Sequence, residues 1–368
     1  MKQKDYPLAD WGDYLKLTAC TAVILQSVLG LAINLPLPKA TQVGIGFTYD
    51  LVKFTAPAFI FGILFTTIRL RAAVKQSYWQ YLRQQWSALF LPSICWTIIY
   101  LVGLPQLQQT QHYHNFSSFI WQFFNGNAAP HLWYNTMMLQ FIILMPLFWW
   151  LAVWCRQRPA RAWSTVIVTV LFAGSWLLGY QHLVGSRPEH WYLLDRIWLS
   201  FVLFAILGVL TSLAQSKIAY WLKKLRYWLL AGWVLTYLWT GWQLFRNGLP
   251  IKLSQASYYQ FSMTIYDLLV IGLIILLAEH QRQQKPTVAQ KVHWLAGFAY
   301  KAYLANVFWA VIWWQVGGRQ LTLLQPAVGI IGVYLLTWLS SYATAIGLKA
   351  LVGRVQNVFE LRLKKKNN

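Results

Sequence analysis

Ten long apolar runs restrict the folds that this sequence can adopt. A helix of about 20 residues crosses the roughly 30 Å hydrocarbon core of a bilayer. The runs lie near residues 14–35, 48–70, 84–104, 131–154, 164–181, 195–214, 228–246, 262–280, 293–315 and 323–350. Only 11% of the residues are charged, against about a quarter in soluble proteins. The sequence therefore predicts an all-α polytopic membrane bundle of about ten transmembrane helices, with residues 1–368 as a single domain.

The basic residues indicate which helix ends face the cytoplasm, because cytoplasmic loops carry an excess of Lys and Arg. With these spans, 21 of the 31 Lys and Arg residues fall on the side of the two termini and 6 on the other side. Both termini are therefore expected in the cytoplasm. The net charge of +22 comes from short clusters between apolar runs. No basic domain could grip a phosphate backbone, so the bilayer and not a nucleic acid is the expected partner.

The first run carries polar side chains at unusual depth. At about 100° and 1.5 Å per residue, the step from Lys16 to Ser27 returns to nearly the same helix face about 16 Å deeper. Gln26 points roughly 80° away. A lysine above a small hydroxyl on one face suggests a lined cavity. The alternative is a snorkelling lysine and a serine that packs against a neighbouring helix.

Other ionisable groups in the spans are functional candidates, because charge is costly inside a bilayer. Lys16, Arg83 and Lys301 lie in or near the predicted cytoplasmic half. A ring of cations there suits a cytosolic polyanion such as the phosphates of coenzyme A; ordinary positive-inside residues are the alternative. Lys53 and Asp267 lie near the predicted outer ends of their spans. They can pair, meet a polar acceptor or snorkel.

His131 opens the fourth run, with Trp133 and Tyr134 beside it. Its polar tip can reach the outer mouth while the neighbouring rings sit at the interface; a satisfied interfacial histidine is the alternative. The sequence contains no phosphate-binding loop, zinc-protease motif or paired carboxylates. Its three cysteines are isolated. We therefore expect neither a disulfide framework nor a metal site.

Five stretches follow one another in an order typical of a known family. They read YLKLTACTAVILQSVLG, TAPAFIFGILFTT, YLRQQWSALFLPSICWTIIY, GNAAPHLWYNTMMLQFIILMP and FAYKAYLANVFW. Together they resemble the acyltransferase 3 family of membrane O-acyltransferases, and most its branch of IcaC-type proteins of intercellular adhesin polysaccharide. The resemblance implies a plasma-membrane protein with no tightly bound cofactor. It would take acyl-CoA from the cytoplasm and acylate a glycan or lipid-linked sugar outside.

The chain departs from the family pattern at two positions. The family normally carries an Arg in its first span and, eleven positions on, a His that serves as general base for the acceptor hydroxyl. Here these positions hold Lys16 and Ser27, and a later family His corresponds to Asn306. Arg83 matches the basic residue before the third span, and the HLW motif begins at His131.

The resemblance and its departures leave three hypotheses. The protein transfers an acetyl or succinyl group to an envelope polysaccharide, with Ser27 as a covalent relay or His131 as the base. Alternatively it has lost catalysis and exports or holds a polysaccharide, or it is a structural partner of a glycan synthase. Under the first hypothesis Lys16, Arg83 and Lys301 hold the CoA phosphates. The residues expected along the channel or at the acceptor are Gln26, Ser27, Trp133, Tyr134 and Asn306.

Overall fold

The computed structural model describes residues 7–73, 77–109, 111–186 and 191–366, and this part is helical with no strand. The helices are α1 (Trp11–Ala32), α2 (Lys39–Leu51), α3 (Thr55–Ala73), α4 (Tyr78–Gln85), α5 (Leu91–Gly103), α6 (Phe116–Phe124), α7 (Leu132–Ile143), α8 (Met145–Gln157), α9 (Pro159–Ser186), α11 (Val202–Leu213), α12 (Gln215–Lys224), α13 (Arg226–Phe245), α14 (Phe261–Gln284), α15 (Pro286–Trp313), α16 (Arg319–Leu324) and α17 (Pro326–Lys366). Single π-helical turns join α4 to α5 (Trp86–Phe90) and α15 to α16 (Trp314–Gly318). Short 3₁₀ turns lie at Pro105–Leu107, Tyr192–Arg196, Trp198–Phe201 and Leu253–Gln255.

The apolar runs form a polytopic membrane bundle. Within the described residues, seven helical stretches are long and apolar enough to cross a membrane, and nine if each of two bent pairs is one span. The pairs are α7 with α8, bent by 56°, and Trp198–Leu213 with α12, bent by 101°. The predicted all-α multi-pass fold is confirmed. The count of ten stays a prediction, because α13, in the run expected at 228–246, is not among these nine.

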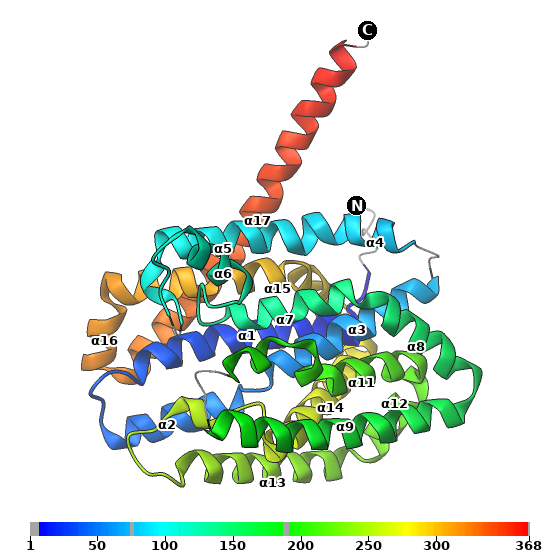
Figure 1. The fold of residues 1–368 in the computed structure, drawn as a ribbon, viewed down its shortest axis with the longest axis horizontal. Helices are drawn as coiled ribbons and strands as arrows, with labels where there is room; N and C mark the ends of the chain where they lie inside the picture. The colour runs from blue at the N-terminus through cyan, green and yellow to red at the C-terminus, as the bar shows by residue number, and fades with distance from the viewer. Residues whose placement is uncertain (1–6, 74–76, 110, 187–190, 367–368) are drawn as a thin grey trace.

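Helix α1 runs through the middle of the bundle and contacts α3, α14, α15 and α17 (Figure 1). Its start follows from the local sequence. Asp10 caps the helix by accepting from the Asp13 backbone N–H at 2.8 Å, and the Asp13 side chain accepts in return from the Asp10 N–H. Such a reciprocal cap satisfies two backbone donors that a helix start leaves open.

Small residues let neighbouring helices approach closely, as is common in membrane bundles. A Cβ built on Gly208 of α11 would lie 2.6 Å from the Phe61 carbonyl oxygen of α3. One on Gly12 of α1 would lie 2.7 Å from the Gly62 carbonyl oxygen of α3. Helix α3 therefore packs closely against both α1 and α11. A larger side chain in place of either glycine would push the helices apart.

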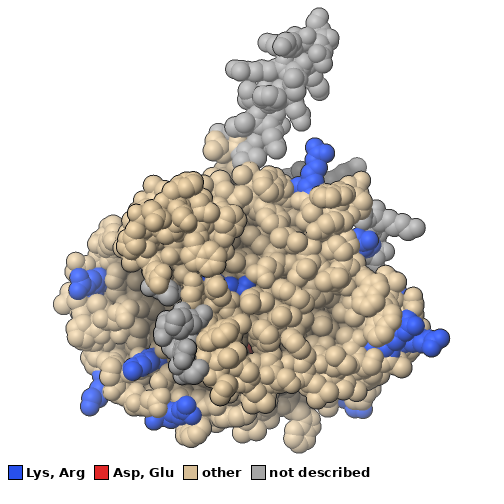
Figure 2. Space-filling model, in the orientation of Figure 1, with Lys and Arg blue, Asp and Glu red and all other residues tan. Residues whose placement is uncertain are grey.

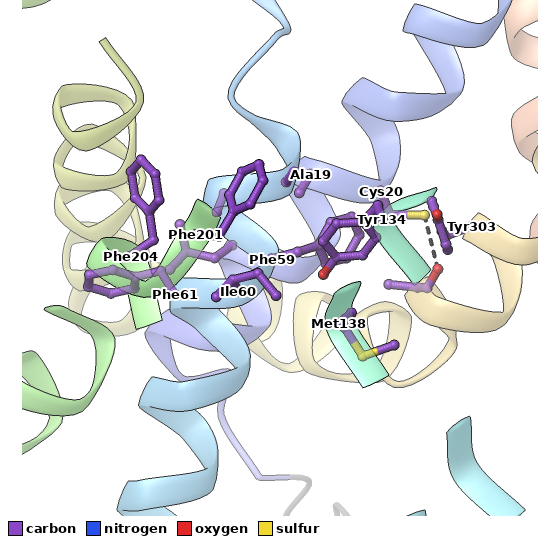
Figure 3. Packing of buried hydrophobic residues seen from close by; sticks show 14 of the residues in the cluster. Ala19, Cys20, Phe59, Ile60, Phe61, Tyr134, Met138, Phe201, Phe204 and Tyr303 are labelled. Carbon is purple, nitrogen blue, oxygen red and sulfur yellow. Dashed lines mark hydrogen bonds between the residues drawn. The ribbon is translucent and has the colours of Figure 1, made fainter. Parts of the chain in front are cut away.

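The core between these helices is rich in aromatic rings (Figure 3). Phe59, Tyr134 and Tyr303 form a triangle whose ring centroids are 5.5 to 5.9 Å apart. All three side chains are buried. They come from α3, α7 and α15, so this triangle ties three helices together near the level of Cys20 on α1.

One face of the molecule presents a broad apolar surface. Figure 2 shows Lys and Arg side chains mostly at the margins of this face, around a wide middle that is almost free of charge. Trp163, Val168 and Leu171 of α9 are among the exposed large apolar side chains. A surface of this kind suits contact with lipid chains.

Candidate functional site

A cavity of about 600 Å³ lies within the bundle. Its walls are the C-terminal half of α1, the α2–α3 turn, the start of α7, the C-terminal part of α15 and the segment before α14. Six residues singled out from the sequence line it together: Gln26, Ser27, Lys53, His131, Trp133 and Tyr134. Residues far apart in the chain thus meet around one hollow.

Ser27 reaches across to α15. Its Oγ lies 2.8 Å from Asn306 Oδ1 and 3.0 Å from the Val23 carbonyl oxygen, so its single proton points at acceptors and not at a base. Asn306 is fully buried, and its Nδ2 donates to the Tyr303 carbonyl oxygen. The two positions at which the sequence departs from the pattern it resembles are therefore hydrogen-bonded to each other.

His131 precedes the first turn of α7 and is held by aromatic neighbours. Tyr100 and Tyr303 stand edge-on to its ring, with centroids 5.2 and 5.1 Å away, and the Tyr303 hydroxyl donates to the His131 carbonyl oxygen. Its Nε2 lies 3.4 Å from the Leu304 carbonyl oxygen, a contact that favours a proton on Nε2. The lone pair is then on Nδ1. This buried atom has no partner among the described residues.

The loop before His131 is fixed by a buried arginine. Arg196 Nη2 donates to Asn127 Oδ1 at 2.6 Å, and Arg196 Nη1 donates to the Tyr192 carbonyl oxygen at 2.9 Å. Gly126 adopts a φ of +77°, where a side chain would also strike Thr136. A left-handed glycine and a buried guanidinium thus set where the HLW motif begins.

Lys53 brings a cation to the cavity wall. Its Nζ lies 3.2 Å from the Tyr49 hydroxyl and 4.4 Å from the centroid of the Tyr258 ring. Of the alternatives open for Lys53 and Asp267, the structure shows the polar acceptor and not a direct pair. Both Asp267 carboxylate oxygens are buried without a hydrogen-bond partner among the described residues. Asp50 is also fully buried, and its Oδ2 accepts from the Thr240 hydroxyl at 2.7 Å.

The residues predicted to hold coenzyme A lie apart from this cavity. Lys16, Arg83 and Lys301 are absent from its lining. Arg83 is exposed and Lys301 is half-buried. Lys16 instead pairs with Asp13 at 2.9 Å. Along α1 the cavity extends from Ser27 as far as Val23 and does not reach Lys16.

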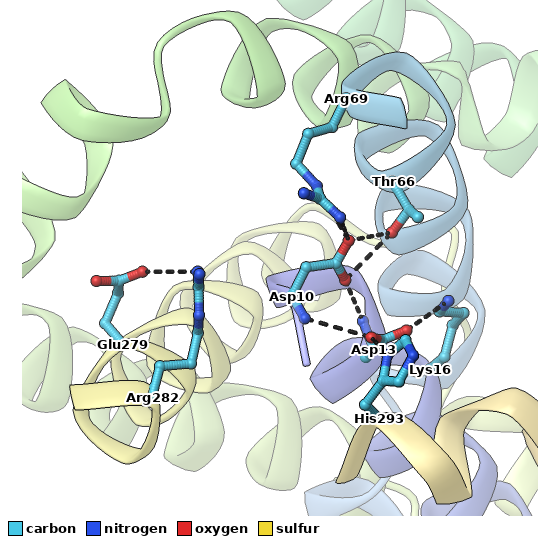
Figure 4. Close-up of polar contacts among 8 residues, drawn as sticks. All are labelled: Asp10, Asp13, Lys16, Thr66, Arg69, Glu279, Arg282 and His293. Atoms are coloured by element: carbon cyan, nitrogen blue, oxygen red, sulfur yellow. Dashed lines mark hydrogen bonds and ion pairs between the residues drawn. The ribbon is translucent and has the colours of Figure 1, made fainter. Parts of the chain in front are cut away.

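A polar cluster surrounds the start of α1 (Figure 4). Asp13 Oδ2 lies 2.7 Å from His293 Nδ1, and Asp10 Oδ2 lies 2.7 Å from Arg69 Nη2. These pairs join the start of α1 to the start of α15 and the end of α3, which places several predicted cytoplasmic basic residues at one end of the bundle. The sequence analysis did not anticipate them. The sequence did contain one sign of these pairs: Asp10, Asp13, Arg69 and His293 all lie at the predicted cytoplasmic ends of their spans.

The triangle of Phe59, Tyr134 and Tyr303 separates this cluster from the cavity. On each of the helices α3, α7 and α15, the triangle residue is the cavity-lining residue closest to the end of the bundle where Lys16 lies.

No described residues form a group of three or more His, Cys, Asp or Glu side chains that could hold a metal ion.

Fold and cavity define an integral membrane protein with a partly polar interior site. A family model described as an acyltransferase domain, of the acyltransferase 3 type, matches residues 10–344. The chain therefore belongs to the acyltransferase 3 family. It is also 26% identical over 126 residues to Major facilitator superfamily domain-containing protein 8 of Xenopus laevis, a match that covers 34% of this chain and 22% of that protein. No solved structure matches.

Proposed function

We propose that this protein is a plasma-membrane O-acyltransferase of the IcaC-type branch. It moves an acetyl or succinyl group from cytosolic acyl-CoA to an envelope polysaccharide or lipid-linked sugar. The observation that carries the proposal is the His131 Nδ1, which has no hydrogen-bond partner in the described part of the chain. His131 lies at the wall of a cavity shared with Ser27, in a member of the acyltransferase 3 family.

In this proposal His131 is the general base. The acceptor hydroxyl gives its proton to Nδ1, its oxygen bonds to the thioester carbonyl carbon, and the carbon–sulfur bond breaks. The coenzyme A thiolate then takes the proton from the imidazolium. The Tyr134 hydroxyl lines the cavity without a partner in the described part of the chain, and it can donate to the carbonyl oxygen as negative charge develops there. Because Nδ1 is buried, acceptor binding has to open the contacts around the ring.

A covalent relay through Ser27 has weaker support. A serine nucleophile needs a base within hydrogen-bond reach of its proton. The Ser27 proton instead faces the Asn306 amide oxygen and the Val23 carbonyl. We therefore assign Ser27, together with Gln26, to the channel wall.

On the donor side, Lys16, Arg83 and Lys301 would bind the phosphates of coenzyme A. The Lys16 ammonium is shared with Asp13, so a bound phosphate would compete with that carboxylate. Phosphate oxygens accept strong charge-assisted hydrogen bonds from lysine. The coenzyme is a co-substrate here, and no tightly bound cofactor is invoked.

The test is to delete the protein and measure ester-linked acyl groups on the envelope glycans. We expect these esters to disappear and to return when the wild-type chain is supplied. His131→Ala should lower the transfer rate by about 10²- to 10⁴-fold, the usual contribution of a general base, whereas Ser27→Ala should retain most of it. The reverse ranking would assign the reaction to a Ser27 relay.

A second candidate function follows from the Ser27–Asn306 hydrogen bond, which occupies both positions of the family histidines. A member that has lost catalysis would export or hold the polysaccharide, or support a glycan synthase. If deletion leaves acylation unchanged and traps glycan inside the cell, export replaces the proposed transfer. Unchanged acylation with less glycan made would favour the synthase partner.

A further inference from the structure

A second hollow, of about 420 Å³, opens at the end of the bundle opposite the start of α1. We name it the outer pocket. It lies between the C-terminal ends of α9 and α13 and the residues that lead into α14. The outer pocket is lined by Tyr180, Gln181, Val184, Gln243, Arg246, Asn247, Gln255, Ser257, Tyr259 and Gln260.

Side-chain amides dominate this lining, and the local hydrogen bonds use only part of each. Gln181 Nε2 donates to the Tyr259 carbonyl oxygen at 3.0 Å, which leaves its Oε1 as an acceptor. Gln260 Nε2 donates to the Gln255 carbonyl oxygen at 2.9 Å, which again leaves Oε1. Gln243 Oε1 accepts from the Ser262 hydroxyl, which leaves its Nε2 as a donor. The pocket thus offers both donors and acceptors whose orientations are fixed.

This mixture fits the hydroxyl groups of a sugar, each of which can donate and accept. Tyr180 and Val184 add an apolar patch for the C–H face of a pyranose ring. Among the residues that the structure describes, the lining contains one cation, Arg246, and no carboxylate. A lipid phosphate would instead favour a cluster of Lys and Arg.

One segment forms a wall of both hollows. The cavity that holds Ser27 is lined by Ile251, Lys252, Leu253 and Tyr258 of this segment. The outer pocket is lined by Gln255, Ser257, Tyr259 and Gln260 of the same segment. Tyr258 faces the cavity while Tyr259 stacks on Tyr180, with centroids 3.9 Å apart. The two hollows are therefore separated by the thickness of one chain segment.

We propose that the outer pocket binds sugar units of the acceptor glycan next to the unit that enters the cavity. The identity of the ligand as an acceptor rests on the proposed function. The binding itself does not, because it needs no acyl donor and no chemistry.

The test uses the full chain in detergent and titrates it with maltotetraose, cellotetraose and chitotetraose, without acyl-CoA. At least one tetrasaccharide should bind saturably and more tightly than its monosaccharide. Gln243→Leu and Gln260→Leu should each weaken that binding about tenfold, the equivalent of one hydrogen bond to a pocket that stays dry. Gln84→Leu, an exposed glutamine on α4, is the matched control and should bind like wild type.

Four outcomes would overturn all or part of the inference. Either no tetrasaccharide binds, or binding is insensitive to both glutamine variants while their melting temperatures match the wild type. Saturable binding of glycerol phosphate that is lost in Arg246→Gln would assign the pocket to a lipid headgroup instead. If deletion abolishes glycan acylation but the two variants keep a wild-type KM for the polysaccharide, the proposed function stands and the outer pocket has no part in it.

Discussion

The hydrogen bond between Ser27 and Asn306 joins helices α1 and α15 at a distance of 2.8 Å. From the sequence, Ser27 was noted for its depth and helix face as well as for its departure from the family pattern, whereas Asn306 was noted only for its departure. Their contact shows that the two departures belong to one place in the molecule. A change at either residue therefore alters the surroundings of the other.

Ser27→His should raise acyl transfer if the cavity keeps the family geometry. The new imidazole can donate to Asn306 Oδ1 through one nitrogen and present the other to the cavity as a base. We expect a gain of at least about tenfold in the rate of ester formation on glycans, towards the usual contribution of a general base of about 10²- to 10⁴-fold.

Gln26→His is the matched control for this gain. It places an imidazole at almost the same depth but on another face of α1. The Gln26 amide otherwise donates to the Val52 carbonyl oxygen. Equal activity in both variants, with both chains folded, would mean that an imidazole at position 27 is no better placed to act as a base than one at position 26.

At the scale of helices, much of the arrangement was predictable. Long apolar runs predict spans because a helix satisfies its own backbone polar groups in lipid. The break within the run at 48–70 was not predicted: α2 ends at Leu51 and α3 begins at Thr55. That turn is stabilised by distant partners, since Thr55 contacts the Tyr258 hydroxyl at 2.8 Å and the Leu51 carbonyl oxygen accepts from Tyr266. No local signal reports such contacts.

The candidate site was predictable only in part, for the same reason. Helical periodicity placed Lys16 and Ser27 on one face, but a shared face does not make a shared cavity. The aromatic triangle that closes the cavity between them comes from α3, α7 and α15. The outer pocket was missed because its glutamines lie on two helix ends and one connecting segment, far apart in the sequence, and form no motif.

Helix packing at Gly208 gives a prediction at this scale. In Gly208→Ala the new methyl group would meet the Phe61 carbonyl oxygen at 2.6 Å, so α11 has to move away from α3. Overpacking of this kind usually costs about 1–3 kcal/mol, which should appear as a lower melting temperature of the detergent-solubilised protein. Gly347→Ala on α17 is the control, because nothing lies within 4 Å of its Cβ position. Equal melting temperatures for the two variants would contradict the packing argument.

For the whole molecule, the excess of basic residues on one side predicts a definite orientation. Ser216→Cys, at the start of α12, lies at the predicted cytoplasmic end, and Ser254→Cys lies in the segment between the two hollows. Both residues are exposed. In a background without Cys95, a membrane-impermeant maleimide added to intact cells should label the Ser254→Cys chain only. Labelling of Ser216→Cys alone would reverse the topology.

The triangle of Phe59, Tyr134 and Tyr303 has a further consequence for the living cell. While those rings stay in contact, they close the cavity on the side of the charged cluster at the start of α1. A reactive thioester that arrives from inside would be spared hydrolysis by water from outside. The rings would have to part for each acyl group and close behind it, so the membrane would keep its ion gradient between turnovers.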